Sequence, residues 1–342
     1  MITIAKTAVD TVRAADSPRD LYDSLTAAMR LEHSTVPLYL SAYFSLRPGT
    51  NVDVARTLRS IVIEEMMHFT IVANILNAIG GTPLIDDPTT VPTFPGPLPM
   101  GVATGLNVSA TPMSLPQCKV FMQIEEPDDP IGLPPDPTDP TTIGDFYHAI
   151  ATKITELGDA AFGCPSGPQV VSPSFPSDRL FAVTDAASAV RAITVIVEQG
   201  EGTSTRPFIE PGQTELAHYY RFGEIVNGKR FVTDPTAAEG FSYSGDPVVL
   251  DASPTGIYPM VTDATLDRYR GNATSLRLAT RFCAAYRHLL TRLQKTFTGA
   301  PDALAAAFGL MYEMRIAALA MIETPDPNDP AHCLTPPWIY LP

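Results

Sequence analysis

The sequence predicts a mainly α-helical protein, a four-helix bundle with a long proline-rich crossover and additional C-terminal packing helices. Apolar residues recur with a helical period in several long segments. Two Glu-x-x-His spacings, Glu65 with His68 and Glu215 with His218, fall inside such segments. Residues three apart on an α-helix project from the same face, so each pair can hold a metal ion from one helix.

Composition fits a compact globular chain. Of 342 residues, 45% are hydrophobic and 18% charged, and we expect a single domain over 1–342, with its core bundle at about 18–226. The apolar runs are interrupted, and the N-terminus lacks the apolar core of a secretory signal, so we expect a cytoplasmic protein with no membrane partner. A net charge of −14 without a basic cluster argues against nucleic-acid binding.

A first core helix is expected over 18–43, because Ser17 and Pro18 form an N-cap and first-turn signal. Glu32 lies in the apolar face of this helix. A carboxylate there is costly unless it is protonated, paired or bound to metal.

A second core helix is expected from about Val52 to Gly80, and its apolar face contains Glu65 and His68. Glu64 points about a quarter-turn away. We expect it to support a ligand or face solvent rather than bind metal.

A packed crossover rich in proline and glycine is expected from Thr82 to about Thr142, with a short helix around Leu115–Ile124. A further helix is expected over Thr141–Leu157. Asp145 and His148 share ligand spacing on it, but they lie off its apolar stripe and are expected to form a solvated pair.

The third core helix is expected over Thr184–Gly200 and is apolar on nearly every side, which predicts complete burial. The acids at its end are Glu198 and Glu201. The fourth is expected over Thr214–Val226 and carries Glu215 and His218.

The remaining segment, 227–342, is expected to be irregular to about Tyr269, with two packing helices at Ser275–Phe297 and Asp302–Ile322. The tail from Leu334, which holds the single tryptophan, Trp338, is expected to dock on the bundle.

The two Glu-x-x-His pairs are together more informative than either alone. One such pair is commonly a buried hydrogen bond, but the chain has only 6 histidines, and four helices would otherwise hold unpaired buried carboxylates. The proposed metal ligands are Glu32, Glu65, His68, Glu198 or Glu201, Glu215 and His218. Geometry ranks Glu198 before Glu201, and the two could alternate as ligands. His33 faces away from Glu32 and is expected to be structural.

Carboxylate and imidazole ligands without thiolates suit two iron ions, with manganese as the alternative. The usual purpose of such a site is to activate dioxygen or peroxide. The sequence favours a metal-dependent oxidoreductase acting on a small molecule, in a chain that could form a homo-oligomer. Two other hypotheses stay open, namely a peroxide-disposing or metal-storing protein and a metal-stabilised scaffold without catalysis. No catalytic residue beyond the ligands is assigned.

Four segments resemble the ferritin-like domain family of iminophenyl-pyruvate dimer synthases. They are "LEHSTVPLYLSAYFSL" from Leu31, "VIEEMMHFTIVANILNAIGG" from Val62, "IVEQGEGT" from Ile196 and "ELAHYYRFGEI" from Glu215. The closing "TPPWIY" is similar to the tail of that family. The resemblance implies a ferritin-like bundle in which the first and third helices each give a glutamate and the second and fourth each give Glu-x-x-His. It also implies oxidative coupling of two amino-acid-derived imino acids.

Overall fold

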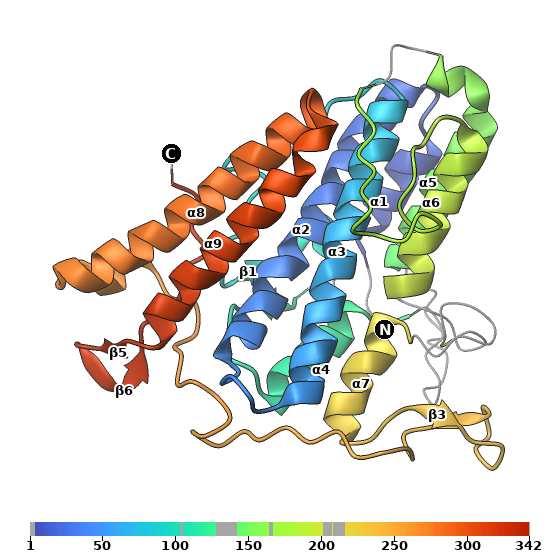
Figure 1. The fold of residues 1–342 in the computed structure, drawn as a ribbon. Helices are drawn as coiled ribbons and strands as arrows, with labels where there is room; N and C mark the ends of the chain where they lie inside the picture. The colour runs from blue at the N-terminus through green and yellow to red at the C-terminus, as the bar shows by residue number, and fades with distance from the viewer. Residues whose placement is uncertain are drawn as a thin grey trace.

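The computed structural model describes residues 4–102, 105–127, 142–163, 167–200, 207 and 216–341. These residues form nine α-helices and three two-stranded antiparallel sheets (Figure 1). The helices are α1 (Lys6–Arg13), α2 (Tyr22–Ser45), α3 (Val52–Ala78), α4 (Leu115–Ile124), α5 (Ile143–Leu157), α6 (Ala186–Gly200), α7 (His218–Asn227), α8 (Ala273–Thr298) and α9 (Leu304–Ile322). The strand pairs are β1 (Gly96–Pro97) with β2 (Asn107–Val108), β3 (Val232–Thr233) with β4 (Phe241–Ser242), and β5 (Pro325–Asp326) with β6 (Asp329–Cys333).

Two long antiparallel helices, α2 and α3, form the centre of the molecule. A 3₁₀ turn at Pro18–Leu21, with Ser17 and Asp20 in a capping box, leads into α2. The C-terminal end of α3 is followed by Gly80, whose φ of +87° is a left-handed conformation that glycine adopts without strain. Both helices bury most of their side chains, so any polar group on their facing sides is removed from water.

Two pairs of shorter helices flank this centre. Helix α4 packs on α7, and α5 packs on α6. In Figure 1, α6 lies above α7 beside α3. The C-terminal ends of α4 and α6 and the N-terminal end of α7 therefore come to the middle of the α2–α3 pair.

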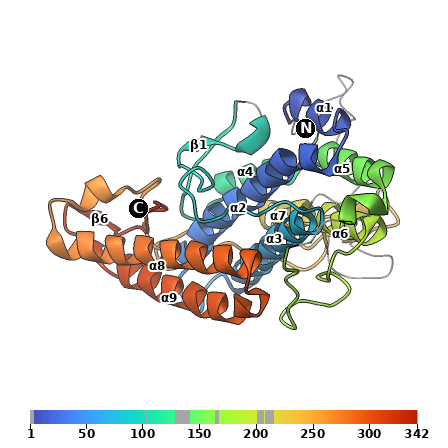
Figure 2. The same cartoon turned by 90° about the horizontal axis from the view of Figure 1, so that it is seen from above.

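The C-terminal helices α8 and α9 form an antiparallel pair on the opposite side of α2 and α3 from α5 and α6 (Figure 2). The tail then returns to the bundle as expected. Nε1 of Trp338 donates a hydrogen bond of 2.7 Å to Oγ of Ser41 in α2, and the indole ring packs edge-on against Phe282.

The prediction of a mainly α fold with a crossover and C-terminal packing helices is confirmed. Three details were wrong. The fourth core helix, expected from Thr214, begins at His218, because the backbone at Ala217 is extended (ψ 157°); Leu216 and Ala217, which precede His218, are not helical, so the expected Glu-x-x-His pair on one helix is not formed here. Helix α1 was not expected, because its short apolar stripe is limited to Val9 and Val12 among polar residues. Helix α6 is not buried on every side: Val195 and Val197 stay partly exposed, because α3 and α5 cover only one face.

Within the described ranges, two segments are long and apolar enough to cross a membrane by length and composition alone, which differs from the sequence expectation. In Val52–Ala78, 89% of the apolar 18-residue stretch is buried inside the protein. A core helix has this property because both its sides are covered. In Pro301–Ile322 only 33% of the corresponding stretch is buried, so α9 keeps apolar side chains outside the core.

Candidate metal centre

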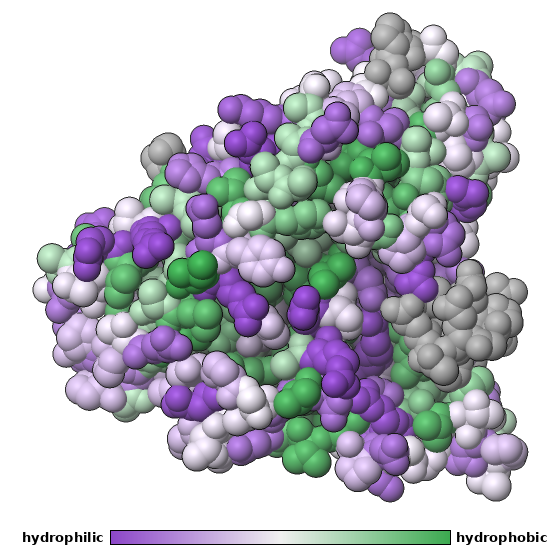
Figure 3. Space-filling model, in the orientation of Figure 1, coloured by the Kyte–Doolittle hydropathy of each residue, from purple (hydrophilic) through white to green (hydrophobic). Residues whose placement is uncertain are grey.

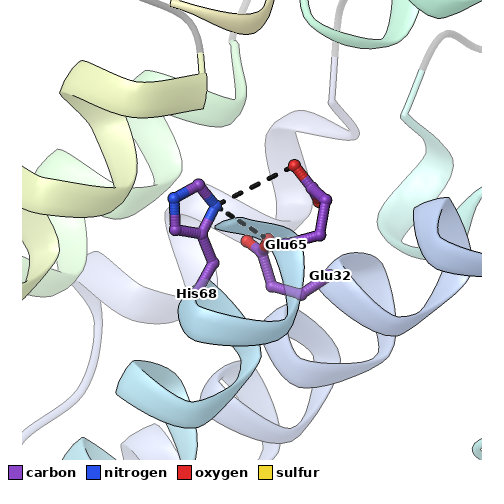
Figure 4. A group of neighbouring side chains, drawn as sticks. All are labelled: Glu32, Glu65 and His68. Atoms are coloured by element: carbon purple, nitrogen blue, oxygen red, sulfur yellow. Dashed lines mark ion pairs between the residues drawn. The ribbon is translucent and has the colours of Figure 1, made fainter. Parts of the chain in front are cut away.

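A cluster of buried carboxylates and imidazoles lies where the short helices meet α2 and α3. Glu32 from α2 and Glu65 and His68 from α3 form one group (Figure 4). Glu65, Glu125 at the end of α4 and His218 at the start of α7 form a second. In each group the candidate ligand atoms all lie within 4.8 Å of one another. Glu65 belongs to both groups, as a carboxylate that bridges two ions would.

The two histidines are oriented alike. Nε2 of His68 lies 3.0 Å from Oε1 of Gln199 in α6, and Nε2 of His218 lies 2.8 Å from Oε2 of Glu64. Both acceptors hold the proton on Nε2, so each ring presents an unprotonated Nδ1 when neutral. Nδ1 of each ring faces the carboxylates, and a neutral imidazole with its second nitrogen held in this way is the usual form of a metal-ligating histidine.

The three carboxylates are also oriented alike, because a hydroxyl group donates to one oxygen of each. Tyr147 donates to Oε1 of Glu32, Tyr39 to Oε1 of Glu125, and Thr35 to Oε2 of Glu65.

The other oxygen of each carboxylate faces a histidine. Oε2 of Glu32 lies 3.5 Å from Nδ1 of His68, and Oε2 of Glu125 lies 3.4 Å from Nδ1 of His218. Oε1 of Glu65 faces both rings, at 4.0 Å from Nδ1 of His68 and 2.9 Å from Nδ1 of His218.

Three of these four distances fit atoms that share a metal ion; the exception is the 4.0 Å between Glu65 and His68. Two ligand atoms that are each about 2.1 Å from one ion are separated by about 3–3.5 Å. Among the described residues, Nδ1 of His218 makes no hydrogen bond, although two carboxylate oxygens lie near it and its side chain is fully buried. An ion at the point which these atoms face would satisfy Nδ1 and neutralise the carboxylates.

The electrostatics of the cluster without metal are unfavourable. Burial, together with the negative charges of Glu125 and Glu32, raises the pKa of Glu65 to about 7, although His218 acts in the opposite direction. Glu125 is also the C-cap residue of α4, at the negative end of the helix dipole, where a buried anion is disfavoured. A cation among these carboxylates would offset their mutual repulsion.

The histidines respond in the complementary way. Burial disfavours their charged form, but the surrounding carboxylates outweigh it and raise the pKa of His68 and, more strongly, that of His218. In the metal-free protein the protons therefore occupy the positions that metal ions would take.

Glu64 has a separate role beside the cluster. It accepts hydrogen bonds from His218 and from the guanidinium of Arg221, which also donates to Oγ of Ser60 at 3.0 Å. Burial opposes ionisation of Glu64, but Arg221 and His218 lower its pKa to about 2. Glu64 thus stays an anion that orients His218, which fits the expectation that it supports a ligand; it is buried and does not face solvent.

The sequence-predicted ligands are distributed unevenly. Glu32, Glu65, His68 and His218 come together. Glu198 is half-buried and is in neither group formed by the described residues. Its neighbour Gln199 continues the buried stripe of α6 and reaches His68 instead. The remaining two candidates, Glu201 and Glu215, lie outside the described residues.

Sequence reasoning missed Glu125 and assigned no function to Gln199. Glu125 follows the short helix predicted at Leu115–Ile124, and its only sequence signal is an acidic pair after an apolar helix and before a proline. His33 is structural, as expected: Tyr286 and the carbonyl of Thr90 contact its two ring nitrogens.

Comparisons with known proteins agree with this architecture. A sequence model of the Ferritin-like family matches residues 25–227. The crystal structure of a ferritin-like protein from Caulobacter vibrioides aligns with a TM-score of 0.58 at 23% sequence identity, covering 88% of this chain and 93% of that chain. At this identity the likeness shows the fold alone. No curated protein matches the chain. The family match covers α2 to α7, the helices that hold the carboxylate and histidine cluster, and the chain therefore belongs to the Ferritin-like family.

Proposed function

We propose that the chain is a dimetal oxidoreductase, with two iron ions, that uses dioxygen or peroxide to oxidise a small, amino-acid-derived imino substrate. The observation that carries this proposal is Glu65, shared between two groups in which Nδ1 of a histidine faces carboxylate oxygens. Glu32 and His68 would hold one ion, Glu125 and His218 the other, and Glu65 both. Glu198, Glu201 and Glu215 remain candidates for further ligands.

The donor set supports iron, with manganese as the alternative. It consists of carboxylate oxygens and imidazole nitrogens, and the described cysteines, Cys118, Cys283 and Cys333, are not in either group. Such donors suit iron and manganese better than they suit metals that prefer thiolates. When bound, these ions supply electron transfer to the oxidant and Lewis acidity.

The protein side chains would control geometry and protons. Tyr39 and Tyr147 each hold a proton at Oη and donate it in a hydrogen bond to a carboxylate oxygen. Each tyrosine can transfer this proton to that oxygen when the carboxylate becomes more basic. Burial and the nearby carboxylates, Glu125 first among them, raise the pKa of Tyr39 well above its usual value, so its proton stays in place at neutral pH.

The size of the chamber limits what can react inside it. The cavity beside the cluster measures about 40 Å³ and is lined by Ile124, Ile143 and Ile196 as well as the carboxylates. Cavities that enclose organic ligands usually measure about 300–1,000 Å³. Among the described residues there is therefore room for ions and small solutes, and for the imino group of a substrate, but not for an aromatic ring.

This small chamber favours a second candidate function, disposal of peroxide or oxidation and storage of iron without an organic substrate. The imino substrate is supported by the sequence resemblance, whereas the second function is supported by the cavity. The two differ in what consumes the oxidant.

Elemental analysis of the purified protein after anaerobic reconstitution with iron(II) tests the metal centre. We expect about two ions per chain in the wild type and in the control Glu313→Gln, a change of an exposed residue of α9, and fewer in Glu65→Gln. A wild-type protein that holds no iron or manganese after reconstitution would refute the proposal.

Oxidant consumption separates the functions. Rapid loss of peroxide with no organic compound present supports the second candidate, and loss that depends on an added aryl imino acid supports the first. If oxidant leaves the absorption spectrum of the bound metal unchanged, the cluster is a structural site and both are wrong.

A further inference from the structure

A groove of about 710 Å³ separates α2 and α3 from α9, on the side of the bundle away from α5 and α6. Val36, Val62, Met66 and Met311 line it, and Phe175 closes it from the loop that precedes α6. No described residue lines both this groove and the chamber beside the metal ligands. The volume is within the range of small-molecule sites.

The groove continues into the protein interior. A second chamber, of about 70 Å³, shares Met66, Phe308 and other walls with it and reaches Phe69, Leu290 and Trp338. Leu290 is 2% exposed and Trp338 7%. A flat surface for a protein partner would not extend to such buried residues, whereas a narrow apolar molecule could occupy both spaces. Figure 3 shows apolar surface over α9 and α3 on the face of Figure 1.

Two cations lie in the wall of this groove, whose other lining residues, apart from Ser174, are aliphatic, aromatic or methionine side chains. Arg59 of α3 and Arg315 of α9 are the only charged residues among the described ones that line it. Neither has an ion-pair partner within the described part of the chain. Arg56, one turn earlier on α3, pairs with Asp53 at 2.8 Å.

Both arginines are exposed, and the guanidinium of Arg315 lies 5.7 Å from the ring centroid of Tyr43, which also lines the groove. Arginine without an acid partner beside apolar surface is suited to bind a carboxylate, since its planar guanidinium donates two parallel hydrogen bonds. The apolar walls beyond it stabilise a hydrocarbon chain. The groove therefore combines the two features that a fatty acid requires.

We propose that the groove binds a medium-chain carboxylate, a fatty-acid-like molecule, with its carboxylate at Arg59 and Arg315. On α3 the lining residues extend from Arg59 to Met66, about 10 Å along the helix axis. An acyl chain of medium length covers this distance, and its end enters the chamber at Phe69. This site does not depend on the metal centre, and its occupancy can be measured in metal-free protein.

Isothermal titration calorimetry with dodecanoate, kept below its micellar concentration, tests the proposal. We expect one molecule per chain, and about tenfold weaker binding in Arg59→Gln and in Arg315→Gln, because each change removes one charge-assisted contact. Arg56→Gln, an exposed arginine of the same helix outside the groove, should bind as the wild type does. Dodecanol, which has no charge, should bind the wild type and both groove variants equally.

A groove-filling variant, Met311→Trp, should lose both dodecanoate and dodecanol while it keeps the helical circular dichroism of the wild type. Dodecanoate binding that is absent, or that is equal in the wild type and both arginine variants, overturns the proposal. So does a concentration-dependent dimer in sedimentation that Ile63→Asp dissociates, because a second copy then covers the groove. Since two arginines are changed separately on different helices, a folding failure of one variant leaves the other as the test.

Discussion

Glu65→Gln should stabilise the metal-free protein at alkaline pH and remove its response to metal. Glu65 is fully buried between two other carboxylates, and its pKa is raised to about 7 from a usual value of 4.5. Glutamine keeps nearly the same shape but carries no charge. The variant therefore separates the cost of the negative charge from the packing of the side chain.

The size of the effect follows from linkage. A carboxyl group whose pKa is raised on folding binds its proton more tightly in the folded state, so it stabilises the fold below pH 4.5 and loses this contribution as pH rises through 7. Each pKa unit corresponds to about 1.4 kcal/mol. At pH 8 the ionised Glu65 therefore lowers the free energy of unfolding by about 3 kcal/mol relative to a neutral side chain of the same shape. The amide keeps one oxygen, which can accept the hydrogen bond from Thr35, but it no longer places a second oxygen near Nδ1 of His218, and this loss costs about 1 kcal/mol. We therefore expect metal-free Glu65→Gln to be about 2 kcal/mol more stable than the wild type at pH 8, and about 1 kcal/mol less stable at pH 4.5.

Urea denaturation of chelator-treated protein at both pH values, followed by circular dichroism, measures this reversal of sign. Added iron(II) or manganese(II) should then raise the melting temperature of the wild type and of Glu313→Gln, but not that of Glu65→Gln. A variant that is destabilised equally at both pH values, or that keeps the full metal-dependent increase, would show that Glu65 neither carries the buried charge nor binds metal.

Three other predictions concern the partners of the proposed ligands. Gln199→Leu should weaken metal binding by about 10- to 100-fold in a metal titration, because His68 loses the acceptor that fixes its Nε2 proton; an unchanged affinity would mean that the amide only fills space. Tyr147→Phe and Tyr39→Phe should each lower the free energy of unfolding, measured by urea denaturation, by about 1–3 kcal/mol. In each variant a buried carboxylate loses its hydrogen-bond donor. An unchanged free energy of unfolding would contradict the hydrogen-bond pattern. Metal affinity of the wild type should fall as pH decreases below 7, because Glu65 becomes protonated and the raised pKa values of the histidines retain protons that metal must displace; competition with a chelator at pH 6 and pH 8 measures this.

Periodicity predicted the long helices because each buries a wide apolar face. The stripes on 18–43 and 52–80 correspond to α2 and α3, and the short helix at Leu115–Ile124 has the predicted bounds. Helix α1 escaped prediction because its amphipathic pattern contributes only two fully buried residues. Local patterns predict a helix well when many of its side chains are buried, and less well when it covers the edge of a core.

The candidate centre was partly predictable for a similar reason. Glu32, Glu65 and His68 interrupt apolar stripes, so their burial could be inferred from neighbours on the same helix. Glu125 could not be inferred in this way. It follows the last residue of α4, where no stripe specifies direction, and only the packing of α4 against α7 brings it to His218.

The difference between Glu198 and Gln199 shows how the same rule could have been applied further. The buried positions of α6 include Ala189, Ala192 and Ile196, spaced by three and four residues, and this stripe continues to position 199 and not to 198. Because α6 has valines on its other side as well, hydrophobicity alone does not identify the buried stripe. The small residues Ala189 and Ala192 do identify it, since they allow close approach to a neighbouring helix.

A neutral amide at position 199 also has a physical advantage. It accepts the Nε2 proton of His68 without adding a fourth carboxylate to a cluster whose charges already raise the pKa of Glu65 to about 7. Within the described residues, helix α6 thus contributes to this site by orienting the imidazole of His68.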